Sequence, residues 1–248
     1  MKAMILAAGL GTRLRPLTDD RPKALVEAGG RTLLEITLAR LREFEIDEVI
    51  VNVHHFADMV VDYLKANNNF GMHIEISREE TLLDTGGGLK KAGWFFLQDS
   101  IASREPFIVH NVDVISTIDL KRMLQFHNES AALATLAVQD RETSRYLLFD
   151  QDRRLCGRRA GRDGKPEIVR RPSLPSPMCA LAFSGIHVIS PRIFPLMTED
   201  GPFSIIATYL RLAAQEENVC AFRGDEYYWR DLGRPENVAQ AQAGAKAP

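Results

Sequence analysis

The stretch Lys2-Ala-Met-Ile-Leu-Ala-Ala8, followed at once by Gly9-Leu-Gly11-Thr-Arg13, decides how the rest of the chain is interpreted. A short apolar run that ends in glycine is typical of a buried parallel strand feeding a loop. Backbone N–H groups in such a loop can approach phosphate oxygens closely, and Arg13, Arg15 and Lys23 place cations nearby. We therefore expect residues 2–8 to form a strand and the loop after it to contact phosphate.

The spacing of this loop excludes two common phosphate-binding motifs. In the dinucleotide pattern GxGxxG, the third glycine would fall on Leu14, and no GK[ST] follows as a Walker A loop requires. On composition alone, an ordinary turn with solvated arginines explains the segment about as well as a phosphate loop does.

The first half of the chain alternates between strand and helix patterns. Apolar or β-branched runs predict strands at 48–53, 73–77 and 106–109, and helical spacing predicts helices at 33–44, 59–65 and after Asp84, which can cap a helix opened by Gly86, Gly87 and Gly88. This alternation favours a mostly parallel sheet covered on both faces, with ligands bound beyond the carboxyl ends of the strands.

The second half of the chain has a different character. Its patterns predict strands at 131–138, 146–149 and 182–189 and helices at 205–215 and 235–243. Residues 156–177 are rich in Arg, Gly and Pro, so we expect a mobile loop or an irregular hairpin there, and we expect the last residues, AGAKAP, to be a frayed tail.

Composition narrows the possible partners and the compartment. A formal net charge of -2 gives no broad cationic field for nucleic acid, and no apolar run approaches the ~20 residues of a membrane-spanning helix. Cys156, Cys179 and Cys220 are far apart and odd in number, which predicts neither a disulfide framework nor a CxxC motif and fits the cytoplasm. The six histidines form no metal-binding pattern.

The motif Leu6-Ala-Ala-Gly-Leu-Gly-Thr-Arg-Leu-Arg-Pro-Leu-Thr18, with Pro22-Lys23 close behind, resembles the signature of the sugar-1-phosphate nucleotidyltransferases. The likeness continues at Leu83–Gly88, Asn111–Asp113, Ser184–Ile186 and Trp229–Glu236, so it spans nearly the whole chain. Within the family, the chain is most similar to short single-domain mannose-1-phosphate guanylyltransferases and N-acetylmuramate-1-phosphate uridylyltransferases.

This resemblance implies an α/β fold with a Rossmann-like, mixed but mostly parallel sheet and helices on both faces, as in nucleotide-diphospho-sugar transferases. It implies a single domain over residues 1–248, with a nucleotide-binding half at 1–130, a sugar-phosphate-binding half at 131–240 and a tail at 241–248. The implied reaction joins a nucleoside triphosphate to a sugar 1-phosphate with Mg²⁺ and releases pyrophosphate.

The resemblance also implies a role for particular residues. Arg13 and Lys23 would be catalytic, because they neutralise phosphates, while Asp113 and Asp231 would bind Mg²⁺ and Asn111, Ser184 and Gly185 would contact the sugar. The nucleotide would be held by Leu6, Ala7, Ala8, Gly9, Gly11, Thr12, Arg13, Thr85, Gly86 and Gly87.

Each of these roles has a physical rationale. The attacking phosphate is already an anion, so positioning and cations suffice and no side chain must remove a proton. Mg²⁺ prefers hard oxygen ligands such as Asp113 and Asp231, although either residue alone could equally be a turn or cap aspartate. The glycines at 86–88 would not block a flat base and their amides could read its edge, although a tight helix entry explains them nearly as well.

Three positions depart from the family pattern: Val112 stands where glycine is usual, and Leu147 and Arg234 replace a glycine and a threonine. A side chain at 112 could crowd the ligand. The segment 156–177 matches no family motif, and its arginines suit either a solvated loop or a cationic lid over a phosphorylated substrate; they are Arg158, Arg159, Arg162, Arg170 and Arg171.

Two other functions compete with this one, a non-catalytic sensor and an NAD-dependent oxidoreductase. A non-catalytic nucleotide-sugar sensor would keep the loops but lose metal or triphosphate contacts, whereas Arg13, Lys23, Asp113 and Asp231 are all present. An NAD-dependent oxidoreductase is disfavoured by Leu14. The base (guanine or uracil), the sugar (mannose, heptose or muramate type) and the choice between a monomer and a small homo-oligomer stay open.

Overall fold

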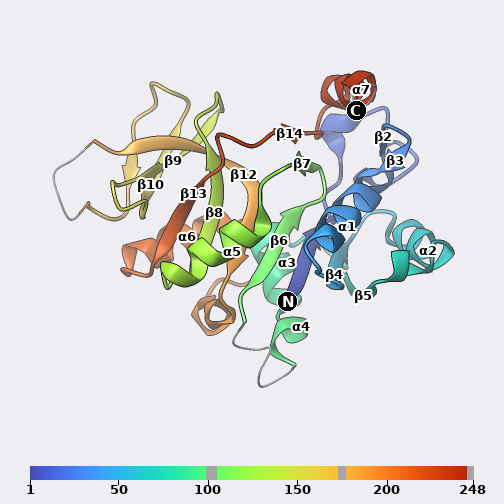
Figure 1. Ribbon diagram of the computed structural model, residues 1–248, viewed down its shortest axis with the longest axis horizontal. Helices are drawn as coiled ribbons and strands as arrows, with labels where there is room; N and C mark the ends of the chain where they lie inside the picture. Colours follow the sequence, from blue (N-terminus) through green and yellow to red (C-terminus); the bar gives the residue numbers. More distant parts are fainter. Residues whose placement is uncertain (99–104, 173–176, 245–248) are drawn as a thin grey trace.

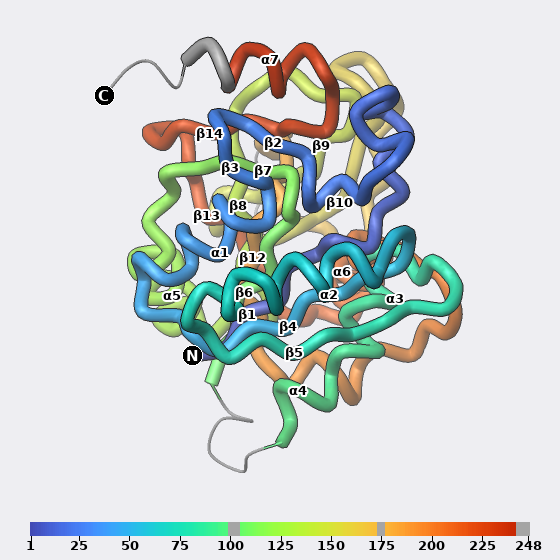
Figure 2. The backbone as a smooth tube through the Cα atoms, turned by 90° about the vertical axis from the view of Figure 1, so that its right-hand side faces the viewer, coloured from blue at the N-terminus to red at the C-terminus, as the bar shows by residue number. Residues whose placement is uncertain are grey.

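Strand β1 (Lys2–Leu6) lies inside the sheet, next to β4 (Glu48–Val53) and β6 (Phe107–Asn111) (Figure 2), and all five of its residues are buried. The computed structural model describes residues 1–98, 105–172 and 177–244. Strand β1 ends at Leu6 rather than at residue 8, because Ala7 and Ala8 already belong to the loop. The glycine loop therefore begins directly at the carboxyl end of a central strand.

The first half of the chain forms the parallel part of the sheet. Strand β1 pairs in parallel with β4 (Glu48–Val53) on one side and β6 (Phe107–Asn111) on the other, and β4 pairs in parallel with β5 (His73–Arg78). The other elements of this half are α1 (Leu33–Glu43), α2 (Ala57–Ala66), α3 (Asp84–Lys91), α4 (Gly93–Leu97), the hairpin β2 (Glu27–Ala28) and β3 (Arg31–Thr32), and the 3₁₀ turns η1 (Thr12–Leu14), η2 (Lys23–Leu25) and η3 (Asn68–Gly71).

The second half extends the same sheet mainly with antiparallel strands, so that ten of the described strands form one mixed sheet. These strands are β8 (Ala134–Gln139), β9 (Arg145–Phe149), β10 (Leu155–Ala160), β11 (Glu167–Ile168), β12 (Cys179–Ile189) and β13 (Val219–Arg223), of which β13 alone pairs in parallel, with β8. The remaining elements are β7 (Val114–Ser116), α5 (Leu120–Glu129), η5 (Pro191–Leu196), α6 (Ile205–Ala214), β14 (Trp229–Asp231) and α7 (Pro235–Gly244).

Apolar side chains on both faces of the sheet explain why helices cover both sides (Figures 1 and 2). Because side chains alternate along a strand, Ala3 and Ile5 pack with α1, α2 and α5, whereas Met4 packs on the opposite face with α3, α4 and α6. The predicted fold class, a mixed α/β sheet with helices on both faces, is confirmed.

Several predicted boundaries need correction. The helix at 84 takes Leu83 as its N-cap, and Asp84 is its first residue, whose carboxylate accepts a hydrogen bond from the Thr85 amide at 2.6 Å. Helix α7 continues through Gly244, so residues 241–244 are helical rather than part of a tail; residues 245–248 of the predicted tail lie outside the described residues.

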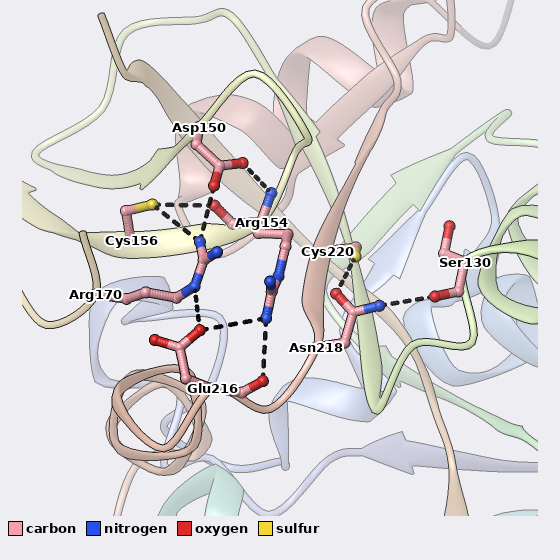
Figure 3. Close-up of polar contacts among 8 residues, drawn as sticks. All are labelled: Ser130, Asp150, Arg154, Cys156, Arg170, Glu216, Asn218 and Cys220. Carbon is pink, nitrogen blue, oxygen red and sulfur yellow. Dashed lines mark hydrogen bonds and ion pairs between the residues drawn. The ribbon is translucent and has the colours of Figure 1, made fainter. Parts of the chain in front are cut away.

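The described part of the segment 156–177 forms an irregular hairpin, in which β10 pairs with β9 and with the short β11; residues 173–176 lie outside the described residues. Its base is held by Arg170, which is buried instead of solvated (Figure 3). The Arg170 Nη1 atom lies 2.8 Å from Asp150 Oδ2, with side chains only 2% and 3% exposed, and Nε lies 3.0 Å from Glu216 Oε2. Arg170 therefore anchors the hairpin and cannot be part of a lid.

Strand β12 creates an opening in the sheet. Ala182 pairs with β9 on one edge and β8 on the other, and His187 pairs with β6 and β8 in the same way. Strands β6 and β9 therefore share one edge of β12, at 186–189 and 179–182, and residues 183–185 between them have no strand partner on that edge. Strand β12 bulges between Phe183 and His187, but the β8 partners of Ala182 and His187 lie three residues apart, so roughly 10 Å separates these two pairings.

Candidate active site

Two aspartates that are distant in the sequence meet beside this opening. Strand β6 ends at Asn111, and Asp113 comes directly before β7, which pairs with β14 so that Val114 lies opposite Asp231. The Leu232 amide also donates a hydrogen bond to the Asp113 carbonyl at 2.7 Å. The short β7–β14 ladder thus fixes the two carboxylates relative to each other.

The electrostatics of this pair show that the two carboxylates are close. Burial and the neighbouring negative charge of Asp113 raise the pKa of Asp231, while the Gly233 amide, Arg13 and Lys23 oppose that rise. Lys23 Nζ lies 2.6 Å from Asp113 Oδ2, and the two side chains are 15% and 8% exposed. Two cations, of which Arg13 is exposed, thus balance two carboxylates at this site.

Gly233 lies where these groups converge. A methyl group on its Cα would lie 2.8 Å from Arg13 Nη2, 2.8 Å from Asp231 Oδ1 and 3.1 Å from Asp113 Oδ2. Only a residue without a side chain leaves this space open. The donor set suits Mg²⁺, because both carboxylates offer hard oxygens to one space and a dication would offset their mutual repulsion; no group of three or more His, Cys, Asp or Glu among the described residues could hold a metal ion.

The glycine loop is held at its start by a buried polar network that sequence reasoning missed. The Ala7 amide donates to Asn52 Oδ1 at 2.7 Å, and Asn52 Nδ2 donates to Glu79 Oε1 at 2.7 Å. Glu79 Oε2 in turn accepts from the Leu83 amide at 2.9 Å. This network links the ends of β1, β4 and β5 to the entry of α3.

Further along the loop, Gly11 has φ 67° and its carbonyl accepts a hydrogen bond from Thr18 Oγ1 at 2.8 Å. A left-handed backbone of this kind favours glycine. Leu6, Ala7, Ala8, Gly9, Gly11 and Thr12 therefore form the turn that leads from β1 to Arg13, but their side chains do not line the main cavity.

Thr85, Gly86 and Gly87 lie in a more crowded place than expected. The Gly86 and Gly87 amides donate to the Phe203 carbonyl at 2.9 and 3.3 Å, and Thr85 Oγ1 accepts from the Ile205 amide at 3.0 Å. An added Cβ at Gly86 would lie 2.4 Å from the Phe203 ring. In this structure the three residues join α3 to the start of α6, and their role in reading a base stays a prediction.

The main cavity has a volume of about 950 Å³ and opens at the gap along β12. It is lined by six of the predicted site residues, namely Arg13, Asn111, Asp113, Ser184, Gly185 and Asp231. The buried Ser184 Oγ has no hydrogen-bond partner among the described residues, so it is available to a ligand. Gly185 has φ 75°, and a Cβ there would lie 2.8 Å from Asn111 Nδ2.

Arg141 lines the same cavity and was not predicted. Its guanidinium carbon lies 3.6 Å from the centroid of the Trp229 ring, and Nη2 donates to the Phe183 carbonyl at 2.8 Å. Burial lowers the pKa of Arg141, and the charge of Asp231 acts in the opposite direction. Arg141 is therefore a third fixed cation near the carboxylate pair.

The three residues that depart from the family pattern lie in different surroundings. Val112 is 1% exposed and belongs to the apolar core against α1, so its side chain does not crowd the cavity. Leu147 lines the cavity, whereas Arg234 is exposed and does not. No helix in the ranges that the structure describes is both long and apolar enough to cross a membrane.

Fold and site together define an α/β protein whose cavity brings cations next to a pair of carboxylates. The chain belongs to the nucleotidyl transferase family, whose sequence pattern matches residues 2–247. This match covers the glycine loop, both aspartates and the hairpin alike.

Comparison with individual proteins agrees. The chain is 36% identical over 248 residues to an N-acetylmuramate alpha-1-phosphate uridylyltransferase of Caulobacter vibrioides, covering 97% of this chain and 95% of that protein. It is 30% identical over 242 residues to a mannose-1-phosphate guanyltransferase of Candida albicans, covering 96% of this chain but only 62% of that protein.

Solved structures share the fold. HddC from Yersinia pseudotuberculosis, complexed with GMP-PN, superimposes with a TM-score of 0.75 over 99% of both chains at 23% identity. A putative glucose-1-phosphate thymidylyltransferase from Bacillus anthracis gives a TM-score of 0.77 at 18% identity, covering 100% of this chain and 96% of that one. These similarities establish the fold class that the sequence predicted.

Proposed function

We propose that this protein transfers a nucleoside monophosphate from a nucleoside triphosphate to a sugar 1-phosphate and releases pyrophosphate. The observation that carries the proposal is the convergence of Arg13, Asp113 and Asp231 in the lining of one cavity, with Lys23 paired to Asp113 beside it. Family membership and relatives that act on sugar 1-phosphates support it.

In the proposed reaction, an oxygen of the sugar phosphate attacks the α-phosphorus in line, and the bond to the β-phosphate oxygen breaks as pyrophosphate leaves. Arg13 and Lys23 offset the negative charge that crowds around the α-phosphorus. The turn at residues 8–12 positions the triphosphate through backbone N–H groups, and Ser184 and Asn111 orient the sugar. Asp113 and Asp231 would hold Mg²⁺, which supplies concentrated positive charge beside the phosphates.

The test is pyrophosphate release by the purified protein with Mg²⁺, across the four ribonucleoside triphosphates and dTTP, each combined with a panel of sugar 1-phosphates. We expect release for one base, with uridine and guanosine as the first candidates from the named activities of the relatives. Addition of EDTA in excess of Mg²⁺ should abolish the signal.

Calorimetric titration with each triphosphate distinguishes this enzyme from a non-catalytic sensor. A folded protein that binds nucleotide but releases no pyrophosphate with any pair would contradict catalysis and favour the sensor. Activity that persists after complete metal removal would contradict the role of Mg²⁺. A cytoplasmic location, a monomeric or small homo-oligomeric state and the division into nucleotide and sugar halves stay predictions.

A further inference from the structure

The end of the cavity away from the two aspartates is lined by cations. Four of them lie on the hairpin of β9, β10 and the loop to β11, and we call them the basic wall: Arg145, Arg158, Arg159 and Lys165. The wall includes a single acidic neighbour in the cavity lining, Glu167, whose Oε2 lies 2.7 Å from Arg158 Nε. The wall therefore carries a net positive charge.

Three members of the basic wall are unpaired. Among the described residues, no carboxylate lies within ion-pair distance of Arg145, Arg159 or Lys165. The Arg159 Nε atom is buried without a hydrogen-bond partner, and its guanidinium lies 5.7 Å from the centroid of the Tyr146 ring. A buried and unsatisfied donor at the edge of a cavity is costly unless a ligand supplies the acceptor.

The 1-phosphate does not account for these cations. The positive charges of Arg13, Lys23 and Arg141 all interact with the Asp231 carboxylate. These three cations therefore belong to the end of the cavity where the 1-phosphate would react. The basic wall begins where β9 pairs with Ala182, beyond the roughly 10 Å gap left open on β12. That gap has about the length of a sugar ring with its substituents.

We propose that the sugar substrate carries a second anionic group, a carboxylate or a phosphate, and that the basic wall binds it. This inference rests on the proposed function, because it assumes that a sugar 1-phosphate spans the gap. Arginine binds carboxylate and phosphate through paired, charge-assisted hydrogen bonds, and a neutral sugar offers the wall no such partner. The acidic substrate named for the Caulobacter vibrioides relative belongs to this chemical class.

The first test uses pairs of substrates that differ in one substituent, which carries the second anion. N-acetylmuramate 1-phosphate has the ring of N-acetylglucosamine 1-phosphate plus an ether-linked carboxylate, and glucose 1,6-bisphosphate adds a phosphate to glucose 1-phosphate. We expect one acidic member to exceed its neutral partner about 10- to 100-fold in kcat/KM, as a charge-assisted contact allows. The pair that shows this difference identifies the anion as carboxylate or phosphate.

The second test removes the wall cations one at a time. Arg159→Gln and Lys165→Gln should lower kcat/KM for the acidic sugar about 10-fold or more, and for its neutral partner much less. Arg171→Gln is the matched control, because Arg171 lies on the same segment, is exposed and does not line the cavity. It should leave both substrates unaffected.

The outcomes separate two kinds of failure. Equal kcat/KM for charged and neutral sugars, or an equal loss for both in the wall variants, overturns the basic wall as an anion site while the proposed function stands. Absence of pyrophosphate with every pair contradicts the proposed function itself.

Discussion

At the scale of single residues, the ion pair between Lys23 and Asp113 has two roles to reconcile. Its 2.6 Å contact leaves the Lys23 amine and the Asp113 carboxylate neutralising each other in the structure without ligand. A bound triphosphate would compete for the amine, which frees the carboxylate oxygen for a metal ion. The pair therefore keeps the site charge-balanced until substrate arrives.

Replacing Asp113 tests this arrangement. Asp113→Asn removes one negative charge from the pair with Asp231, so we expect turnover to fall on the order of 10²-fold or more while the protein stays folded. Pyrophosphate release measures the loss, and circular dichroism checks the fold. Asp62→Asn, on the exposed surface of α2, is the control. Near-normal turnover in Asp113→Asn would remove this residue from the proposed metal site.

Sequence reasoning found the residues at this end of the cavity because a long motif marks them. The family motifs predict six residues that line one cavity, namely Arg13, Asn111, Asp113, Ser184, Gly185 and Asp231. Arg141 was missed because its contacts with Trp229 and the Phe183 carbonyl join segments that only the fold brings together. Asn52 left a weak signal, as a polar residue inside the buried run EVIVNV.

At the scale of elements, Asn52 and Glu79 fix the distance between the glycine loop and α3. Both side chains are buried, and every one of their hydrogen bonds reaches another element end. Gly88 is packed against them so closely that a Cβ would lie 2.7 Å from both Asn52 Nδ2 and Glu79 Oε1. Under the proposed function, a change in this network should therefore alter the affinity for the triphosphate.

A reciprocal exchange tests the network. Asn52→Asp alone places a carboxylate opposite the Glu79 carboxylate, and Glu79→Gln alone places an amide opposite the Asn52 amide. Each single variant loses a hydrogen bond of the network, so each should raise the KM for nucleotide about 10-fold. The double variant restores all three hydrogen bonds with one donor direction reversed: Ala7 donates to Asp, Gln donates to Asp, and Leu83 donates to the Gln carbonyl. We expect it to recover most of the affinity.

Nucleotide titration measures these changes independently of turnover. If the KM for the sugar phosphate rises as much as that for the nucleotide, or if the double variant is worse than either single one, the network has only a general structural role. The melting temperature of each variant serves as the internal control.

The base of the hairpin rests on the buried pair of Arg170 and Asp150 (Figure 3). Burial by itself would lower the pKa of Arg170, but its hydrogen bonds to Asp150 and Glu216 hold that pKa above its ordinary value. Arg170→Gln leaves the Asp150 carboxylate buried without a cation, which should cost roughly 3–5 kcal/mol of unfolding free energy.

Urea unfolding measures this cost. Arg31→Gln is the control, because Arg31 of β3 forms a partly exposed ion pair with Glu35 of α1, and such pairs contribute about 0.2–1 kcal/mol. A loss in Arg170→Gln no larger than in the control would show that the hairpin does not depend on its buried pair.

Some of the elements that the sequence patterns missed are too short to show a period, such as β7 and β14 with three residues each. Length does not explain the others, because the ten-residue helix α5 and the strand β13 were not predicted either. For the apolar strands and amphipathic helices that were predicted in the first half, most of the predicted ends lie within one or two residues of the observed ends.

At the scale of the whole molecule, buried histidines make stability depend on pH. Burial, assisted by Arg192, lowers the pKa of His127 to about 4, and burial lowers that of His187 to about 3. Below their ordinary pKa of ~6.5, the unfolded chain takes up protons that the folded protein refuses. The free energy of unfolding should therefore be highest above pH 6.5, where these histidines are neutral in both states, and should decline as the pH falls toward 4.

Urea midpoints at pH 7 and pH 5 check this expectation. His127→Gln should be less stable than the natural protein at pH 7, because the ring contacts both Thr135 and Ser190, yet lose less stability on going to pH 5. His73→Gln, at an exposed position, should follow the natural protein at both values. An unchanged slope in His127→Gln would show that this histidine does not titrate with unfolding.

The pairing of β7 with β14 has a consequence for how the protein is made. A ribosome delivers the glycine loop, Lys23 and Asp113 more than a hundred residues before it delivers the second carboxylate, Asp231. Under the proposed function, a nascent chain could contact nucleotide but could not consume it. Activity would thus begin only after β14 pairs with β7. A partly synthesised chain without β14 would therefore not hydrolyse triphosphate unproductively.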